Sequence, residues 1–344
     1  MNYSTKNWMN IELCNLLFKS EPYIKEGNTN MRKVLDNKQK GMNINGALIG
    51  LIALFIVFGI LADKFFTVYN IINIARQCSI NLVLAIGMTF VILTGGIDLS
   101  VGGVLALVGT LTAGFITKGM NIGVAMLLGL MIGIGFGTLS GICIAYGKIP
   151  AFIPTMAMLS IARSLALMYS GGYPITGMPK RFSFIGTGSI FGLPVPVIIA
   201  IIIVAIGVFI LKKSILGRYI YAIGGNAKAA SFSGINVNIW TVITYAIHGM
   251  LTAIAGLVLT ARMNSGQPSA ASGIELDIIA AVVIGGTSMA GGKGGVFGTV
   301  VGALVITVLN NGLTLLNVNP YLQGLIVGIV ILVAVFIDKR KETR

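Results

Sequence analysis

Six polar side chains lie inside long apolar stretches of this 344-residue sequence. Their amides and hydroxyl are neutral and form hydrogen bonds in both directions. This chemistry suits contact with an uncharged, polyhydroxylated solute better than with an ion, for which a ring of charges or carbonyls is expected. Hydrogen bonding between helices is the alternative for each residue, so one alone is weak evidence. The six are Gln77, Asn81, Thr94, Asn310, Asn311 and Gln323.

Asp98 is the one carboxylate between Asp63 and Glu275. A lone acid near membrane depth is a functional candidate. The competing role is structural, with Asp98 or Ser100 capping the helix that follows, and the sequence favours this role. A structural role is compatible with a position beside a pathway. The candidate pathway residues are therefore Gln77, Asn81, Thr94, Asp98, Asn310 and Asn311.

Other chemistry has little support in the sequence. Arg76 and Arg163 lie within apolar segments and need partners or water, and His248 is expected to be a packed helix residue rather than a ligand. The three cysteines lack metal or redox spacing. Neither a nucleophile–base arrangement nor paired carboxylates appear, so we expect no enzyme activity, no metal and no cofactor.

The segment 285–294 resembles a phosphate-binding loop but fails at two positions. The motif requires a glycine six residues before the lysine, where Thr287 stands, and a serine or threonine after it, where Gly294 stands. If ATP drives this protein, another polypeptide must hydrolyse it.

The composition places these residues in a bilayer. The sequence is 56% hydrophobic and only 10% charged, with 46 glycines. Soluble domains carry about 25% charged residues, whereas glycine is common in membrane helices. The net charge of +14 does not indicate a nucleic-acid partner, because the cations flank hydrophobic segments.

Apolar runs bounded by charges, glycine or proline predict an all-α integral membrane protein with about ten transmembrane helices. A cytosolic tail over 1–44, with Met31 as a second candidate start, precedes a transmembrane domain over 45–338 and a cytosolic tail over 339–344. The second span is long enough to be tilted or broken, and the eighth is short for a full crossing. The predicted spans are 45–62, 68–94, 100–117, 121–146, 150–169, 193–211, 239–261, 276–290, 295–316 and 321–337.

The distribution of cations predicts the orientation. Of the 24 lysines and arginines, 17 fall on the side of the two termini, five on the other side and two within spans. Cytoplasmic loops are enriched in these residues. Both termini are therefore expected in the cytosol, in a cytoplasmic membrane.

The loop over 212–238 is the longest cytosolic segment between spans. Asn226 is predicted to cap a short helix through Ala227–Ser231 that stops at Gly234. Its small residues make a surface for close contact with another protein. A plain connecting loop is an equally good interpretation of the residues alone.

Glycines recur every four residues in two predicted spans, which allows close helix packing. This pattern favours packing inside the chain over a seam between two copies. The two stripes are Gly129, Gly133, Gly137 and Gly141, and Gly294, Gly298 and Gly302.

The segments together resemble the permease subunits of bacterial ABC importers for monosaccharides, most closely those for ribose. The resemblance covers about 45–338. It rests on 87–102 (GMTFVILTGGIDLSVG), 216–226 (LGRYIYAIGGN), 233–238 (SGINVN), 275–277 (ELD), 285–295 (GGTSMAGGKGG) and 310–313 (NNGL).

The resemblance implies a type II-like, ten-helix permease that works as a homodimer in the lipid bilayer. It further implies a cytosolic ABC ATPase subunit and an extracytoplasmic sugar-binding protein as partners. The family's coupling helix falls in the 212–238 loop of this chain, although 228–232 (KAASF) lacks the acidic or arginine residue expected there. The residues expected to contact the ATPase are Gly224, Gly225, Asn226, Ala229, Ala230, Ser233 and Gly234.

The expected function is translocation of ribose or a related monosaccharide. A permease for xylose, galactose, inositol or a furanosyl signalling molecule is the nearest alternative. An ATP-independent secondary transporter is a more distant one, because membrane carboxylates for a coupling-ion site are scarce.

Overall fold

The computed structural model describes residues 44–342, so the predicted tail 1–44 lies outside it apart from its last residue. Ten of the described helices overlap the ten segments that the sequence predicted as spans. They are α3 (Ile44–Leu61), α4 (Val68–Leu93), α5 (Val101–Thr117), α6 (Ile122–Ala145), α7 (Phe152–Ser170), α9 (Val195–Lys213), α12 (Val237–Met263), α13 (Ile274–Ile284), α14 (Val296–Leu315) and α15 (Pro320–Glu342).

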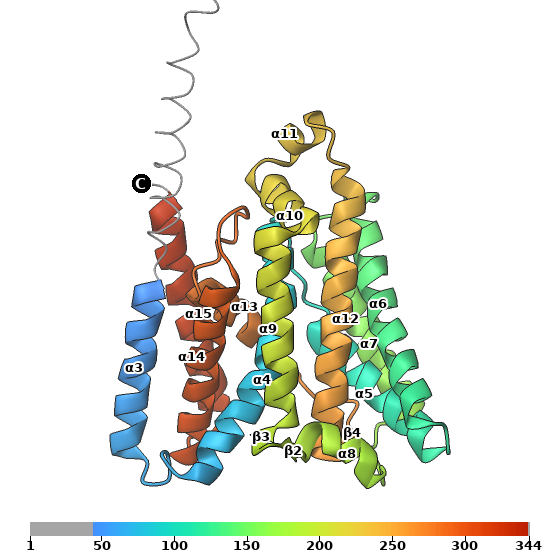
Figure 1. The fold of residues 1–344 in the computed structure, drawn as a ribbon, viewed down its shortest axis with the longest axis vertical. Helices are drawn as coiled ribbons and strands as arrows, with labels where there is room; N and C mark the ends of the chain where they lie inside the picture. The colour runs from blue at the N-terminus through green and yellow to red at the C-terminus, as the bar shows by residue number, and fades with distance from the viewer. Residues whose placement is uncertain (1–43, 343–344) are drawn as a thin grey trace, which may run out of the picture. The chain divides into compact units, whose positions relative to one another are not determined.

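The remaining elements are short. Helices α10 (Ile215–Gly225) and α11 (Ala227–Phe232) lie at one end of the helix bundle, and α8 (Lys180–Thr187) lies at the other (Figure 1). Strand β1 (Ile175–Thr176) pairs with β4 (Ser265–Gly266), and β2 (Ser189–Ile190) pairs with β3 (Leu193–Pro194), both antiparallel.

Six of the described helices are long and apolar enough to cross a membrane: α4, α6, α7, α9, α12 and α14. The chain is therefore an all-α, multi-pass membrane protein. Helix α4 is continuous over 26 residues and is not broken. The eighth predicted span was wrong at its end, because α13 stops at Ile284 rather than at 290. Gly285 ends the helix and Gly286 adopts a φ of 85°, a backbone conformation that suits glycine.

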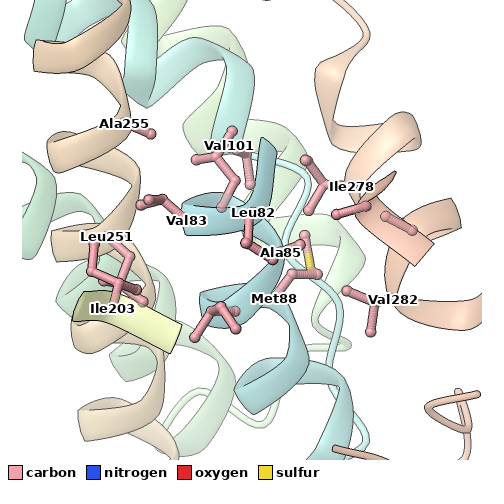
Figure 2. Close-up of a cluster of buried hydrophobic side chains, with 14 of the residues drawn as sticks. Leu82, Val83, Ala85, Met88, Val101, Ile203, Leu251, Ala255, Ile278 and Val282 are labelled. Atoms are coloured by element: carbon pink, nitrogen blue, oxygen red, sulfur yellow. The ribbon is translucent and has the colours of Figure 1, made fainter. Parts of the chain in front are cut away.

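Helix α4 is the centre of the fold. Its apolar window is 83% buried within the chain, compared with 22% for α6 and α7. Figure 2 shows Leu82, Val83, Ala85 and Met88 of α4 surrounded by side chains of α5, α9, α12 and α13. A helix enclosed by protein can carry polar residues that a lipid-facing helix cannot.

Two long helices are each followed by a non-helical segment and a shorter helix. The segment 94–100 links α4 to α5, and 264–273 links α12 to α13. The second segment runs along α5 in the opposite direction, since a Cβ on Gly266 would lie 2.9 Å from the carbonyl of Gly109, and one on Gly102 would lie 2.5 Å from that of Ala271. Helix α13 therefore begins beside the start of α5, inside the bundle.

The glycine stripes pack helices of the same chain, as predicted. In α6, a Cβ on Gly133 would lie 2.5 Å from the carbonyl oxygen of Gly249 in α12, and one on Gly137 would overlap the carbonyl of Tyr245. In α14, a Cβ on Gly298 would overlap the carbonyl of Gly285. Helix backbones approach this closely only where side chains are absent.

Candidate functional site

The cytosolic loop predicted over 212–238 contains two helices. The hydroxyl of Ser214 accepts a hydrogen bond from the Gly217 N–H at 3.2 Å and begins α10. The carboxamide oxygen of Asn226 accepts one from the Ala229 N–H at 3.0 Å and begins α11. The chain leaves α11 at Gly234, whose φ is 83°. The predicted capped helix is confirmed.

The seven residues expected to contact an ATPase divide into two groups. Gly224 and Ala230 face the interior of the chain: a Cβ on Gly224 would overlap the carbonyl of Leu93, and Ala230 is only 5% exposed. The others present an open surface beside Phe232, which is 92% exposed. A hollow of about 350 Å³ lined by 234–238 and Ser231 adjoins it. The exposed group is Gly225, Asn226, Ala229, Ser233 and Gly234.

The polar residues predicted to line a pathway in α4 and at its end have different surroundings. Asn81 donates to the hydroxyl of Thr307 in α14 at 3.1 Å, and both are buried. The Thr94 hydroxyl donates to the Val91 carbonyl within its own helix at 2.7 Å. Gln77 is half-buried.

The carboxamides of Asn70 and Asn311 exchange two hydrogen bonds, of 3.0 and 2.9 Å, between α4 and α14. Sequence reasoning overlooked Asn70, although it lies in a predicted span as the other amides do. These pairs fasten α4 to α14.

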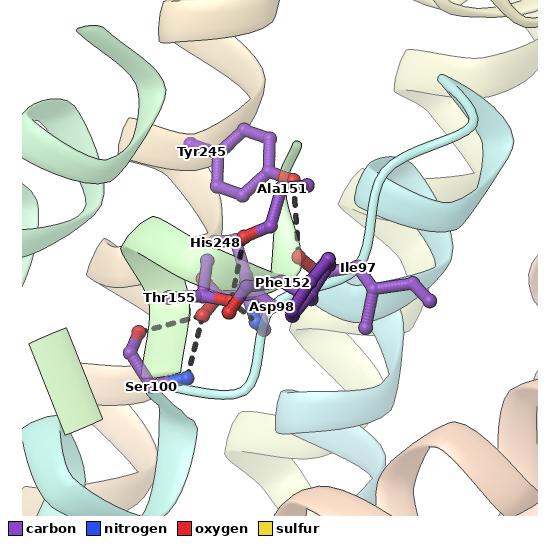
Figure 3. Close-up of polar contacts among 8 residues, drawn as sticks. All are labelled: Ile97, Asp98, Ser100, Ala151, Phe152, Thr155, Tyr245 and His248. Atoms are coloured by element: carbon purple, nitrogen blue, oxygen red, sulfur yellow. Dashed lines mark hydrogen bonds and ion pairs between the residues drawn. The ribbon is translucent and has the colours of Figure 1, made fainter. Parts of the chain in front are cut away.

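Asp98, in the segment 94–100, packs against His248 in the middle of α12 and is 2% exposed (Figure 3). Its Oδ1 accepts hydrogen bonds from the backbone N–H and hydroxyl of Ser100, at 2.8 and 2.6 Å. Its Oδ2 lies 3.7 Å from Nε2 of His248, and the Tyr245 hydroxyl donates to the Ile97 carbonyl at 3.2 Å. These contacts hold the 94–100 segment to α12.

The structural role favoured for Asp98 fits this placement, although its expected form was wrong. Ser100 begins α5 without a side-chain cap, and Asp98 bonds to Ser100 itself rather than to the first turn of the helix. His248 is fully buried, as predicted for a packed residue, and Gly87 leaves the space for its ring.

A second polar cluster lies where α13 begins, and it includes Arg163 of α7. The guanidinium Nη1 donates to the carbonyls of Pro268 and Ala270, at 2.8 and 2.6 Å, and so fixes the 264–273 segment. These carbonyls are the partners that the sequence required for an arginine inside a span. The guanidinium also interacts electrostatically with Glu275, whose Oε2 is buried without a hydrogen-bond partner among the described residues.

In the same cluster, Asn310 of α14 donates to Oδ2 of Asp277 at 3.1 Å. Arg163, Glu275, Asp277 and Asn310 are all partly exposed, and Leu276 between the two acids is 52% exposed. Sequence reasoning placed only Asn310 here. The missed indication was Asp277, a carboxylate inside the predicted span 276–290. These four residues are called the α13 cluster below.

Comparisons with known proteins identify the family. A family model described as a branched-chain amino acid transport system permease component matches residues 70–335. The ribose import permease protein of Haemophilus influenzae is 47% identical over 302 residues, which cover 87% of this chain and 94% of that protein.

The ribose import permease protein of Bacillus subtilis is 46% identical over 316 residues, which cover 90% of this chain and 98% of that protein. The xylose transport system permease protein of Haemophilus influenzae is 34% identical over 370 aligned positions, which cover 89% of this chain and 99% of that protein. No solved structure matches the chain. The chain therefore belongs to this family of transport-system permease components.

Proposed function

We propose that this chain is the membrane-spanning permease subunit of an ATP-driven importer for ribose or a related monosaccharide. Relatives named as ribose import permeases are 44–47% identical to it. Relatives named for allose and xylose are 38% and 34% identical, so ribose is the favoured sugar.

The structure of the α10–α11 segment is the observation that best supports an ATP-driven mechanism. It presents an exposed, capped helix at one end of the bundle, and its other side is seated on the end of the central helix α4. The sequence contains no ATP-binding loop of the phosphate-binding type. Phe232, exposed at the end of the short helix α11, supplies an anchor for a separate ATPase.

The α13 cluster supports a position for the pathway. Charged side chains inside a membrane face a bundle interior or water rather than lipid. The partial exposure of Glu275 and Asp277 supports a position beside a cavity, which we propose that a second copy of the chain completes. Carboxylates and amides form hydrogen bonds with sugar hydroxyls, and only weak binding is compatible with release. Of the pathway residues expected from the sequence, Asn310 has the most direct support.

The proposed topology has ten membrane segments, with both termini and α10–α11 in the cytosol. Helix α13 spans only about 16 Å at 1.5 Å per residue, and the non-helical 264–273 segment covers part of the remaining depth. The sugar-binding protein docks at the opposite end, beside α8. ATP binding closes a pair of ATPase subunits, α10–α11 move with them, and access to the cavity switches from one side to the other.

Uptake in a strain lacking the gene tests this function. We expect the intact transport system to restore uptake of radiolabelled ribose, and an uncoupler to leave that uptake intact. Unlabelled xylose, allose and leucine serve as competitors, and leucine represents the branched-chain amino acids that the family description names. Uptake that collapses with the proton gradient would indicate a secondary transporter, and competition by leucine alone would contradict the sugar assignment.

Gly225→Leu tests the coupling segment, because a Cβ on Gly225 meets nothing within 4 Å inside the chain. We expect a folded permease whose uptake no longer follows ATP hydrolysis. Gly135→Leu is the control, since Gly135 in α6 also has open space around it and lies away from α10–α11. Normal uptake in Gly225→Leu would refute the assignment of this surface.

A further inference from the structure

Three backbone segments meet where α10–α11 contacts the rest of the chain. They are the end of α4 at Leu93, the end of α10 at Gly224, and the loop over 285–295 that links α13 to α14. The Gly292 N–H donates to the Leu93 carbonyl at 2.9 Å. A Cβ on Gly224 would lie 2.5 Å from the Gly292 nitrogen, and one on Gly291 would lie 3.1 Å from the Gly224 Cα.

This contact leaves no room for α10 to move alone. Gly291 and Gly292 have φ values of 87° and 71°, which bring their backbones against α10 in a conformation that other residues rarely adopt. Close-packed interiors transmit displacement because they contain no space to absorb it. A shift of Gly224 toward the bundle must therefore displace the 285–295 loop or the end of α4.

A side-chain hydrogen bond also ties α10 to the loop. The Tyr221 hydroxyl donates to the Gly294 carbonyl at 2.8 Å. Burial raises the pKa of Tyr221 above its usual value, so the phenol keeps the proton that it donates. This bond allows α10 to pull the loop outward as well as push it inward.

The loop adjoins the end of α13, a helix of 11 residues. Ile278–Val283 are buried in the core of the bundle. The other end of α13 carries Glu275 and Asp277 of the α13 cluster. One helix of 11 residues thus links the coupling segment to the polar cluster inside the membrane.

We propose that the 285–295 loop is the transmission element that passes the movement of α10–α11 to α13, with Tyr221 as its positioning residue. Movement of α13 then exposes the α13 cluster alternately to the two sides of the membrane. The inference rests on the proposed function and adds a route: the signal reaches the pathway through the loop and α13. The neighbouring helices α9 and α12, which are continuous in sequence with the coupling segment, are the competing routes.

Tyr221→Phe tests the route in the complete transporter reconstituted in proteoliposomes with its ATPase and binding protein. The variant removes one hydroxyl, and we expect sugar uptake per ATP hydrolysed to fall about fivefold, the factor for one lost hydrogen bond. Tyr219→Phe is the matched control on the same helix. Tyr219 packs edge-on against Trp240, with ring centroids 4.9 Å apart, and its hydroxyl has no hydrogen bond within the described part of the chain.

The second readout follows α13 directly. Leu276 is changed to cysteine in a background in which the native cysteines are replaced and uptake is retained, and its labelling by a membrane-impermeant maleimide is measured with and without ATP and vanadate. We expect labelling that depends on nucleotide with Tyr221 present, and loss of that dependence in Tyr221→Phe. A merely structural role for Tyr221 would leave the nucleotide dependence unchanged.

Gly292→Ala is the second variant, because its Cβ would lie 2.9 Å from the Gly225 nitrogen and force the two segments apart. It should show the same loss. Unchanged coupling and labelling in both variants would overturn the transmission route while leaving the proposed function intact. Failure of Tyr221→Phe to co-isolate with the ATPase would also overturn it, since Tyr221 would then act in docking. If the unmodified system shows no ATP-dependent uptake, the proposed function fails first.

Discussion

Replacement of Asp98 separates its structural role from a role in the pathway. Its Oδ1 accepts two hydrogen bonds from Ser100, at 2.8 and 2.6 Å, and the side chain is 2% exposed. Hydrogen bonds to charged groups contribute about 1.5–3 kcal/mol each. Asp98→Leu removes both and leaves the Ser100 N–H without its partner, so we expect the free energy of unfolding to fall by about 4 kcal/mol.

Asp98→Asn keeps an acceptor oxygen at the same place and loses the charge. Charge-assisted hydrogen bonds are about twice as strong as neutral ones, so the expected loss is about 2 kcal/mol. Asp63→Leu, at an exposed position between α3 and α4, is the control and should change stability by less than about 0.5 kcal/mol.

The measurement is reversible unfolding in mixed micelles, followed by uptake normalised to the amount of folded permease. A structural role predicts that normalised uptake in Asp98→Asn stays near that of the wild type. Stability of Asp98→Leu within about 1 kcal/mol of the wild type would refute the reasoning from the two hydrogen bonds. Normal stability together with lost uptake in Asp98→Asn would instead place Asp98 in the pathway.

Three further predictions concern packing, docking and the pathway. Gly137→Leu should prevent accumulation of folded protein, because its Cβ would lie 3.0 Å from the backbone carbon of Tyr245, whereas Gly135→Leu should behave as wild type in size-exclusion chromatography. Phe232→Glu should abolish co-isolation with the ATPase without changing thermal stability, whereas Phe191→Glu at the opposite end should retain it. Asp277→Asn keeps an acceptor for Asn310 but removes the charge, so we expect the maximal uptake rate to fall about tenfold while stability falls by only about 1 kcal/mol. Normal uptake would remove Asp277 from the pathway.

The sequence predicted the positions of the helices well, because the length of an apolar run is itself the physical requirement for crossing a bilayer. Local chemistry was equally readable. The Asn226 cap and the stop at Gly234 follow from the residue types alone. The end of α13 was misplaced by six residues because 285–290 is uncharged and reads as a continuation of the span, whereas the backbone of Gly286 turns away.

The partners of the polar residues could not be predicted. Asn70 and Asn311 are 241 positions apart and meet only because α4 and α14 are neighbours. Helices that are apolar on all sides carry little periodic information about which face meets which neighbour. For the same reason the sequence identified Asn81 as polar and membrane-embedded without revealing that it bonds to Thr307.

By itself, the sequence determined that the chain is a helical membrane protein and where its long apolar helices lie, and it offered Asn226 and Gly234 as the ends of a short helix between two of them. These properties depend on run length, charge and residue type over a few turns of chain. Only the tertiary structure decided that α4 is the buried centre, that Asp98 meets His248, and that Gly224 rests on Leu93 and Gly292. Contacts between segments far apart in sequence arise from packing of whole helices, and no local pattern encodes them.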